Sequence, residues 1–341
     1  MIKTILVTGG TGYIGSHTVL DLIKNGYRVV ILDDFSNSSP KVLEQLEKLA
    51  GESISLYNVD LKDAKQVEAV FAAEEIDAVI NFAGYKAVGE SVEQPLKYYE
   101  NNLIGLINLV KAMQEFAVKK LIFSSSATVY GQPEIMPLKE SDPIGNVTNP
   151  YGRTKLIIEE ILTDICAANE DFGVVTLRYF NPLGADESGE IGEDPNGIPN
   201  NLAPYITQVA IGKLEKLSVF GGDYPTEDGT CIRDYVHVAD LAAGHTKALD
   251  YLFQDNQGYE IFNLGSGVGY SVYQIIDNFE KVVGRPIPYQ VVGRRAGDIP
   301  VSYAAIDKAK AVLNWSPTKD IGIMCADTWR WQQKHPNGFQ D

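Results

Sequence analysis

Three regularly spaced glycines near the start of the chain constrain its fold more than any other feature. They lie in Thr8–Gly15, which follows the apolar run Thr4–Val7 and leads into the predicted helix Ser16–Asn25. Because glycine has no Cβ atom, such a turn lets backbone N–H groups and a helix N-terminus approach a pyrophosphate. The segment therefore predicts a dinucleotide-binding turn. Its candidate contacts are Gly9, Gly12, Tyr13, Ile14 and Gly15.

The first half of the chain alternates short apolar runs with amphipathic segments of helical length. The predicted strands are Thr4–Val7, Arg28–Leu32, Ser53–Val59, Ala78–Asn81, Lys120–Ser125 and Val174–Tyr179. The predicted helices are Ser16–Asn25, Asp63–Ala73, Leu96–Phe116 and Tyr151–Ala168. Nearly continuous apolar strands separated by helices are typical of parallel strands covered on both faces. We therefore expect an α/β fold with a Rossmann-like, doubly wound parallel sheet.

The second half differs in composition from the first, with segments rich in glycine, proline and asparagine from about residue 181, which predict loops. A chain of 341 residues exceeds the usual size of one domain, about 100–200 residues. We expect a dinucleotide-binding domain over residues 1–180, to which the chain returns around 234–264. A smaller C-terminal α/β domain, mainly residues 181–341, is expected to bind the substrate through its loops.

The composition excludes several classes of partner. With 45 acidic and 29 basic side chains, the formal net charge is −16, which repels nucleic acid and anionic membranes. An anionic ligand would therefore need a local cluster of Arg or Lys. The three cysteines, Cys166, Cys231 and Cys325, are far apart and have no ligand-like spacing, so we expect no metal site and a reduced compartment. Without a long apolar run, a soluble, unexported, cytoplasmic protein is expected.

Polar groups follow the ends of later predicted strands. Asp33 ends the second strand eighteen positions after Gly15, near the spacing at which an acid binds adenosine ribose. Its negative charge opposes a 2′-phosphate and favours NAD over NADP; the alternative is an exposed loop acid. Asp60 and the segment Phe82–Lys86 follow the third and fourth strands, where ligands of open α/β sheets bind. Lys86 is the sharper cofactor candidate there, although a loop lysine is more often simply solvated.

Three residues form a candidate catalytic set. Tyr151 and Lys155 lie four positions apart on one face of a predicted helix, and Ser126 follows the fifth strand. On an ordinary helix this Tyr would pack and this Lys would be solvated. Beside a dinucleotide, however, the ammonium and the positive nicotinamide favour the phenolate, which makes Tyr151 a usable general base. Ser126 would bind the substrate hydroxyl or align Tyr151, and Lys155 would also bind the nicotinamide ribose.

These features together resemble the UDP-glucose 4-epimerase family of extended short-chain dehydrogenase/reductases. The strings that carry the resemblance are Phe82–Ser91, Ser124–Tyr130, Arg178–Pro182, Gly197–Leu202, Tyr224–Thr230 and Arg233–His237. The match extends from the first strand to Trp329–His335. Long, specific strings of this kind make the resemblance strong.

The resemblance implies a tightly bound NAD and a reaction without net redox change. Tyr151 would remove the proton of the sugar 4-hydroxyl while C4 gives up a hydride, and the 4-keto sugar would turn over before it is reduced again. Further implied cofactor contacts are Asn37, Ser38, Asp60, Leu61, Phe82, Ala83, Gly84, Lys86, Asn101 and Phe180. Implied UDP-sugar contacts, besides Ser126 and Tyr151, are Asn181, Asn200, Asn201, Leu202, Ser218, Phe220, Arg233, Arg294, Arg295, Asp298 and Ser302.

Within these contacts, arginines would grip the diphosphate, because a guanidinium offers two parallel donors. Only one of Arg294 and Arg295 need reach it. Four residues after Asp298, where enzymes restricted to UDP-glucose have Tyr, this chain has Ser302. The smaller side chain predicts room for a 2-acetamido group, and thus activity on UDP-N-acetylglucosamine and UDP-N-acetylgalactosamine. A one-residue slip would place Tyr303 there instead.

Other functions remain open at this stage. A nucleotide-sugar 4,6-dehydratase would need an acid and a base directly after Ser126, where this chain has Ala127 and Thr128. A non-enzymatic NAD-sensing module would be expected to lack Tyr151 or Lys155, and an ordinary dehydrogenase would release NADH. The resemblance also implies a homodimer formed through the helices Leu96–Phe116 and Tyr151–Ala168.

Overall fold

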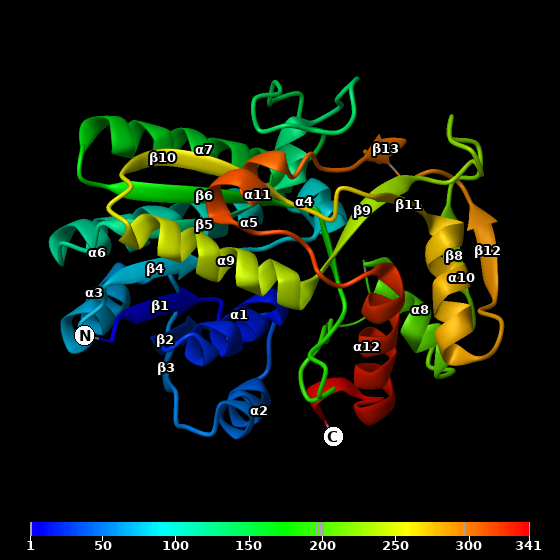
Figure 1. The fold of residues 1–341 in the computed structure, drawn as a ribbon, viewed down its shortest axis with the longest axis horizontal. Helices are drawn as coiled ribbons and strands as arrows, with labels where there is room; N and C mark the ends of the chain where they lie inside the picture. Colours follow the sequence, from blue (N-terminus) through cyan, green and yellow to red (C-terminus); the bar gives the residue numbers. More distant parts are fainter. Residues whose placement is uncertain (1, 196, 198, 200, 296, 341) are drawn as a thin grey trace.

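The computed structural model describes residues 2–195, 197, 199, 201–295 and 297–340. Its larger part is a sheet of seven parallel strands in the order β10-β6-β5-β4-β1-β2-β3 (Figure 1). These are β1 (Thr4–Thr8), β2 (Arg28–Asp33), β3 (Ser55–Asn58), β4 (Ala78–Asn81), β5 (Lys120–Ser126), β6 (Gly173–Tyr179) and β10 (Gly258–Leu264). The predicted Rossmann-like α/β class is confirmed. The order reverses between β1 and β4, the point where such sheets bind dinucleotides.

Helices cover both faces of this sheet because alternate strand residues point to opposite sides. Ile5 and Val7 pack in one core with α1 (Tyr13–Lys24), α2 (Lys41–Ala50), α9 (Val238–Phe253) and α11 (Asp307–Leu313). Leu6, between them, packs in a second core with α3 (Ala64–Ala73), α6 (Gly105–Glu115) and α7 (Pro150–Ala168). Strands buried on both faces explain the nearly continuous apolar runs in the sequence.

The helix expected over Leu96–Phe116 is present as one continuous helical stretch that contains a π turn. The chain passes through α4 (Val88–Glu93), α5 (Pro95–Tyr99), a π-helical turn η1 (Glu100–Ile104) and then α6. A π turn shifts the side chains that follow it around the helix and is frequent at functional sites. Here it buries Asn102, which the apolar pattern of the sequence did not reveal.

A smaller lobe has its own apolar core and lies beyond the carboxyl ends of the main strands (Figure 1). Its elements are β7 (Asn181–Leu183), α8 (Leu202–Ala210), β8 (Leu217–Phe220), β9 (Ile232–His237), β11 (Gly269–Ser271), α10 (Val272–Val283), β12 (Tyr289–Val292), β13 (Val301–Ser302) and α12 (Ile321–Lys334). Short 3-10 turns, η2 (Ala127–Tyr130) and η3 (Gly338–Gln340), complete the chain. Because β10 pairs with β6, residues of the second half extend the main sheet. The boundary at residue 180 remains a prediction.

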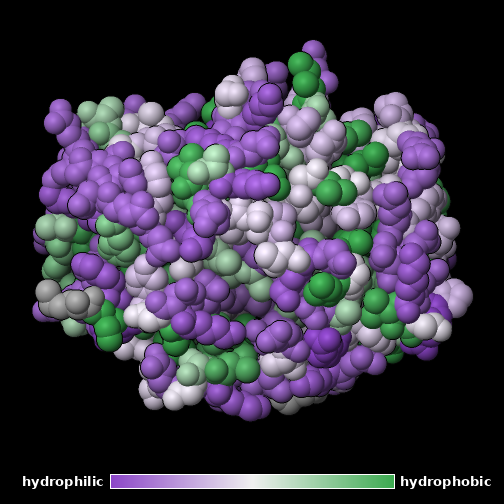
Figure 2. Space-filling model, in the orientation of Figure 1, coloured by the Kyte–Doolittle hydropathy of each residue, from purple (hydrophilic) through white to green (hydrophobic). Residues whose placement is uncertain are grey.

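The face of the molecule seen in Figure 2 is mostly hydrophilic, with small hydrophobic patches between the polar side chains. Within the described part of the chain, no helix combines the length and apolarity needed to cross a bilayer.

Candidate active site

The glycine turn between β1 and α1 is closed so tightly that side chains are sterically excluded from it. A Cβ atom on Gly15 would lie 2.1 Å from the carbonyl oxygen of Gly9. Gly9 itself has a φ of +70°, and its Cβ would lie 2.8 Å from the backbone nitrogen of Ala83. The turn therefore brings the N-terminus of α1 against the strand ends without intervening side chains, a cradle that suits a pyrophosphate. The residues present fit the dinucleotide that the sequence predicted.

At the end of β2, Asp33 is buried and its carboxylate has three donors. Oδ2 accepts from the backbone N–H of Thr11 at 3.0 Å, and Oδ1 accepts from the backbone N–H of Phe35 and the hydroxyl of Ser38, each at 3.0 Å. A carboxylate has about four acceptor sites, so one remains for a ribose hydroxyl. The alternative of an exposed loop acid is wrong because Asp33 is only 7% exposed. Asn37, by contrast, is exposed.

The ends of β3 and β4 bring further predicted contacts to the same edge of the sheet. Asp60 accepts from the backbone N–H of Lys62 at 2.9 Å, and Leu61 is buried against Gly105 of α6. The predicted contacts Phe82 and Ala83 are partly buried, while Gly84 is exposed. Both segments therefore lie where the switch point of the sheet predicts a dinucleotide.

Lys86 does not point freely into solvent. Its ammonium lies 3.5 Å from Oε1 of Glu193, and the side-chain amide of Asn201 donates to the same oxygen at 2.6 Å. Glu193 thus joins a predicted cofactor contact to a predicted substrate contact. No local pattern pointed to Glu193, because its partners are 107 and 8 residues away.

Asn102 is a second residue that sequence reasoning missed. From the π turn, its side-chain oxygen accepts from the backbone N–H of Tyr85 at 2.8 Å. Its amide group donates to the Tyr85 carbonyl at 3.1 Å and to the Thr154 hydroxyl at 3.0 Å. Asn102 therefore ties the loop after β4 to the helix turn that carries Lys155. The predicted contact Asn101 is its partly buried neighbour.

The three predicted catalytic residues converge at the carboxyl end of β5. Tyr151 is in the first turn of α7, which begins at Pro150 after its cap Asn149 accepts from the backbone N–H of Gly152 at 2.8 Å. The ammonium of Lys155 donates to the backbone carbonyl of Ser124 at 2.6 Å and lies 5.9 Å from the centre of the Tyr151 ring. Ser126 lies close enough to Tyr151 to lower the pKa of its phenol through hydrogen bonding. The catalytic role of these groups stays a prediction at this point.

The electrostatics of this set differ from the sequence-based expectation. Burial raises the pKa of Tyr151, and its hydrogen bond with Ser126 offsets only part of that shift. Burial likewise lowers the pKa of Lys155 to about 8, against the opposing charge of Glu159. The expected lowering by Lys155 is therefore wrong for this structure, because the ammonium is bound to Ser124 and desolvation dominates. As it stands, the Tyr151 phenol is protonated at neutral pH.

Across the cleft, β9 and the loop before β13 bring cations together around one carboxylate. Arg295 donates to both oxygens of Asp298, at 3.0 and 3.2 Å, and a nitrogen of Arg233 lies 3.8 Å from the same carboxylate. The guanidinium of Arg295 also lies 5.7 Å from the ring centre of Phe220, which is 40% exposed at the end of β8. An anionic ligand of this acidic chain would need such a local group of cations.

Arg294 is directed elsewhere. It donates to the carboxylate of Asp223 at 2.7 Å and lies 4.2 Å from the ring centre of Tyr224. The structure therefore places Arg295, and not Arg294, beside Arg233 and Phe220. The expectation that only one member of the pair reaches the diphosphate stays a prediction.

The other predicted substrate contacts come from three segments of the smaller lobe. Asn181 is exposed on β7, Leu202 begins α8 and Ser218 lies on β8. Phe180, a predicted cofactor contact, is buried against Val129 and Leu156. Asn200 lies outside the described residues.

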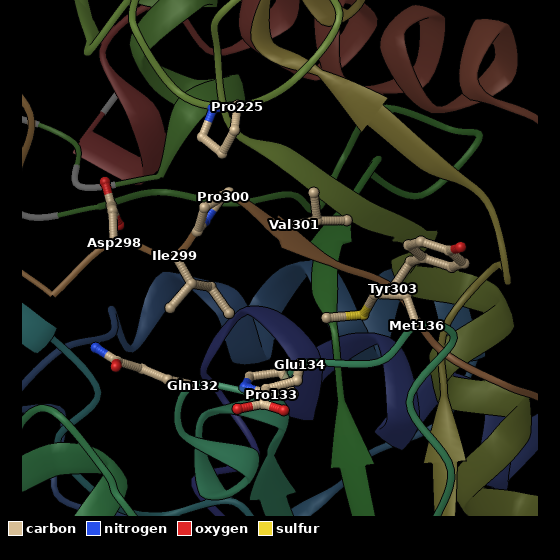
Figure 3. A pocket seen from close by; sticks show the side chains of 10 residues that line it. All are labelled: Gln132, Pro133, Glu134, Met136, Pro225, Asp298, Ile299, Pro300, Val301 and Tyr303. Atoms are coloured by element: carbon tan, nitrogen blue, oxygen red, sulfur yellow. The ribbon is translucent and has the colours of Figure 1, made fainter.

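Ser302 and Tyr303 point to different sides of the chain. Tyr303 lines a cavity of about 580 Å³ between the loop after β5 and the segment before β13, together with Gln132 and Glu134 (Figure 3). Ser302 is buried and pairs in register with Arg233, so its side chain shares a face with that arginine. Asp298 lines the same cavity as Tyr303, so which of the two side chains lies nearer the sugar stays a prediction.

His237 has a structural explanation. Its Nδ1 accepts from the backbone N–H of Ala239 at 3.0 Å and caps α9, which leaves the proton on Nε2 to be donated to Asp327 at 3.1 Å. Across the described residues, no group of three or more His, Cys, Asp or Glu side chains is arranged to hold a metal ion.

The comparisons with known proteins point to nucleotide-sugar enzymes. The family model described as GDP-mannose 4,6 dehydratase matches residues 6–328. A UDP-glucose 4-epimerase of Bacillus subtilis (strain 168) is 55% identical over 336 residues, which cover 98% of each chain.

Solved structures agree with this similarity. The UDP-glucose 4-epimerase of Bifidobacterium longum, in complex with NAD+ and UDP, has a TM-score of 0.96 and 50% identity over 98% of this chain and 100% of that one. The UDP-Glc/GlcNAc 4-epimerase of Campylobacter jejuni has a TM-score of 0.84 and 38% identity over 97% and 99% of the two chains.

Proposed function

We propose, since the chain belongs to the UDP-glucose 4-epimerase family of extended short-chain dehydrogenase/reductases, that it interconverts UDP-glucose and UDP-galactose by NAD-dependent inversion at C4. It is accordingly an isomerase of nucleotide sugars, with the place in galactose metabolism that its substrates imply. One observation carries the proposal: Tyr151, Lys155 and Ser126 meet at the end of β5, in a fold that also has a glycine turn suited to a dinucleotide and a group of arginines around Asp298.

The glycine turn and Asp33 would hold the dinucleotide, and Lys155 would bind its nicotinamide ribose. When bound, NAD supplies the hydride acceptor at C4 and a positive charge that opposes the raised pKa of Tyr151. Tyr151 then takes the proton of the 4-hydroxyl, which Ser126 keeps in line, and returns it after the sugar has turned. Because NAD is restored in each cycle, no net redox change occurs.

The substrate region would grip the nucleotide and leave the sugar free to rotate. Arg233 and Arg295 can offer forked donors to the diphosphate, Phe220 can pack on the uracil, and Asp298 can accept from the ribose. Tight contacts at the nucleotide and loose ones at the hexose are what inversion by rotation requires. These roles of Arg233, Arg295, Phe220 and Asp298 are proposals.

A dehydratase is disfavoured, although the matching family model carries that name. Elimination needs a proton donor and acceptor next to Ser126, and the following residues, Ala127 and Thr128, form the turn η2. Neither side chain exchanges a proton at neutral pH. An NAD-sensing module is disfavoured because Tyr151, Lys155 and Ser126 are all present and brought together.

Activity on N-acetylated UDP-sugars forms part of the proposal. Ser302 shares a face with Arg233, and its small side chain would obstruct a 2-acetamido group less than a Tyr at this position. A relative of this fold from Campylobacter jejuni is named as a UDP-Glc/GlcNAc 4-epimerase, which supports this reading.

A homodimer in the cytoplasm is the proposed state of the protein. Large apolar side chains stay exposed along α4, α5, η1 and α6, among them Leu96, which is 79% exposed. We expect these helices, together with α7, to pack against the same helices of a second protomer. All three cysteines are free and buried, in keeping with a reducing compartment. Sedimentation of the purified protein should give twice the 37.4 kDa chain mass.

The function is tested by incubating the purified protein with UDP-galactose, UDP-glucose and both N-acetylated analogues. We expect each sugar to be converted to its C4 epimer, with bound NADH absorbing transiently and no NADH released. Release of stoichiometric NADH would indicate an ordinary dehydrogenase. A 4-keto-6-deoxy product would indicate a dehydratase, and no turnover of any substrate would support the sensing module.

A further inference from the structure

A buried ion pair lies directly behind the reacting groups. Arg178 of β6 and Glu159 of α7 are 1% and 3% exposed, and the guanidinium donates to the carboxylate at 2.6 and 3.1 Å. Ser125 of β5 donates a third hydrogen bond to the same carboxylate. Arg178 is itself held 4.8 Å from the ring centre of Tyr130. Two strands therefore fix the position of the Glu159 side chain.

The same carboxylate belongs to the helix face that carries the reacting groups. Tyr151, Lys155 and Glu159 follow one another at intervals of four residues along α7, so they line one face of the helix. Their partners on β5 are equally close in sequence: Lys155 donates to the backbone of Ser124, and Glu159 accepts from the hydroxyl of Ser125. The ion pair and the catalytic set therefore share both a helix face and a strand end.

Stability alone gives little reason for such a pair. Removing two charges from water costs about as much as their attraction returns, and apolar replacements of a buried pair are often neutral or stabilising. A buried pair next to a reaction centre therefore points to an electrostatic task. The group that needs a negative charge here is Lys155, because burial lowers its pKa to about 8 and the charge of Glu159 opposes that shift.

The other titratable groups facing this set do not supply that charge. Burial raises the pKa of Tyr151 on α7, of Tyr179 on β6 and of Tyr98 on α5. Burial also raises the pKa of Tyr259 on β10, which faces Glu159. These phenols are neutral near pH 7. On β6, Arg178 is held as a cation by Glu159, whose bonds outweigh the effect of burial and raise its pKa.

We propose that Glu159 is a positioning residue for the reaction: fixed by Arg178 and Ser125, its carboxylate keeps Lys155 an ammonium in the dry site beside Tyr151. This inference rests on the function proposed above, in which Lys155 binds the nicotinamide ribose beside Tyr151. Arg178 acts one step further away, because it neutralises and orients Glu159 without touching Lys155.

The test compares pH profiles of kcat for UDP-galactose in the wild type and in a Glu159→Gln, Arg178→Met double variant. Removing both charges avoids an unpaired buried cation, so the double variant is expected to fold and to retain NAD. Without the anion the pKa of Lys155 falls, so the alkaline limb of the profile should move to lower pH. The double variant should therefore lose kcat several-fold on the alkaline side of the wild-type optimum, and kcat should hardly change at about pH 6.

Two further variants make the result decisive. Glu159→Asp retains the anion and should restore the alkaline limb to within a few tenths of a unit of the wild type. Glu160→Gln removes the next, exposed carboxylate of α7 and should leave the profile unchanged. A folded double variant with the wild-type profile would overturn the proposal, and so would one that cannot fold, since the pair would then serve the fold. If the wild type shows no turnover, the proposed function fails instead.

Discussion

The cofactor region and the substrate region of this protein are built in opposite ways. The cofactor region is a rigid backbone cradle: Gly9 and Gly15 leave no space for a side chain, and Asp33 is fixed by three hydrogen bonds. The substrate region is a ring of long side chains from separate loops. Its cations are already paired with carboxylates of the same chain, as Arg295 is with Asp298.

This difference suits the two tasks of an epimerase. A cradle made of backbone needs no reorganisation when it binds, which favours a cofactor that stays in place. Arginines that rest on internal carboxylates must exchange or share those partners with a diphosphate, so substrate binding and release can remain fast.

The largest effect is expected where the two regions meet. Replacing Tyr151→Phe removes the proton acceptor and should lower kcat by roughly 10²–10⁴-fold, the usual contribution of a positioned acid or base. Binding of NAD and UDP should both persist, as measured by cofactor absorbance and calorimetry. Tyr273→Phe in the smaller lobe serves as control and should retain full activity. Inversion at the wild-type rate in the Tyr151 variant would remove Tyr151 from the mechanism.

The cofactor cradle should fail from the addition of a single methyl group. In Gly15→Ala the new Cβ would lie 2.1 Å from the Gly9 carbonyl, so the turn must open. We expect the protein to purify with little NAD and to bind it roughly 10²-fold more weakly, about 2.7 kcal/mol. Gly89→Ala is the matched control, because a Cβ there meets open space. Equal NAD content in both variants would show that the cradle does not depend on the close approach.

The substrate ring should lose affinity without losing the cofactor. Arg295→Ala removes a charge-assisted donor pair worth about 1.5–3 kcal/mol, so KM for UDP-galactose should rise about 10–100-fold. Arg294→Ala should change KM far less, since that arginine pairs with Asp223 away from Phe220. Steady-state kinetics on NAD-loaded protein separates the two. A larger effect from Arg294 would reverse the assignment of the phosphate-binding arginine.

The smallest effect is expected in the sugar pocket. Ser302→Tyr fills the space next to Arg233 and should lower kcat/KM for UDP-N-acetylglucosamine by about ten-fold relative to UDP-glucose, since one misplaced group is worth about 1–3 kcal/mol. Tyr303→Phe is the control, because Tyr303 lines the cavity on the other side. An unchanged ratio in the Ser302 variant would place the selectivity elsewhere.

The sequence alone predicted the sheet and the cofactor region well, for a physical reason. Buried parallel strands leave long apolar runs, and their carboxyl ends meet at one edge, so residues such as Asp33 and Ser126 could be placed together from local pattern. Helices α10 and α12 were not predicted, because their positions within the loop-rich second half give a weaker pattern. The π turn was also missed, since nothing in the residues Glu100–Ile104 distinguishes it from an α-helical turn.

Contacts between residues that are far apart in the sequence could not be predicted from local patterns. The link from Lys86 to Glu193, the contact of Arg295 with Phe220 and the pair formed by Arg178 and Glu159 all join residues brought together by packing. The protonation of Tyr151 belongs to the same class, because desolvation depends on the surroundings of the side chain and not on its neighbours in sequence.

The parallel sheet, the glycine cradle and the residue types of the catalytic set could be inferred from the sequence, because they depend on short-range sterics and on local patterns of apolar residues. The folded structure was needed to show which charges face one another and which groups are buried away from water. Electrostatic energies depend on distance and solvent exposure in three dimensions, and the chain acquires both only when it folds.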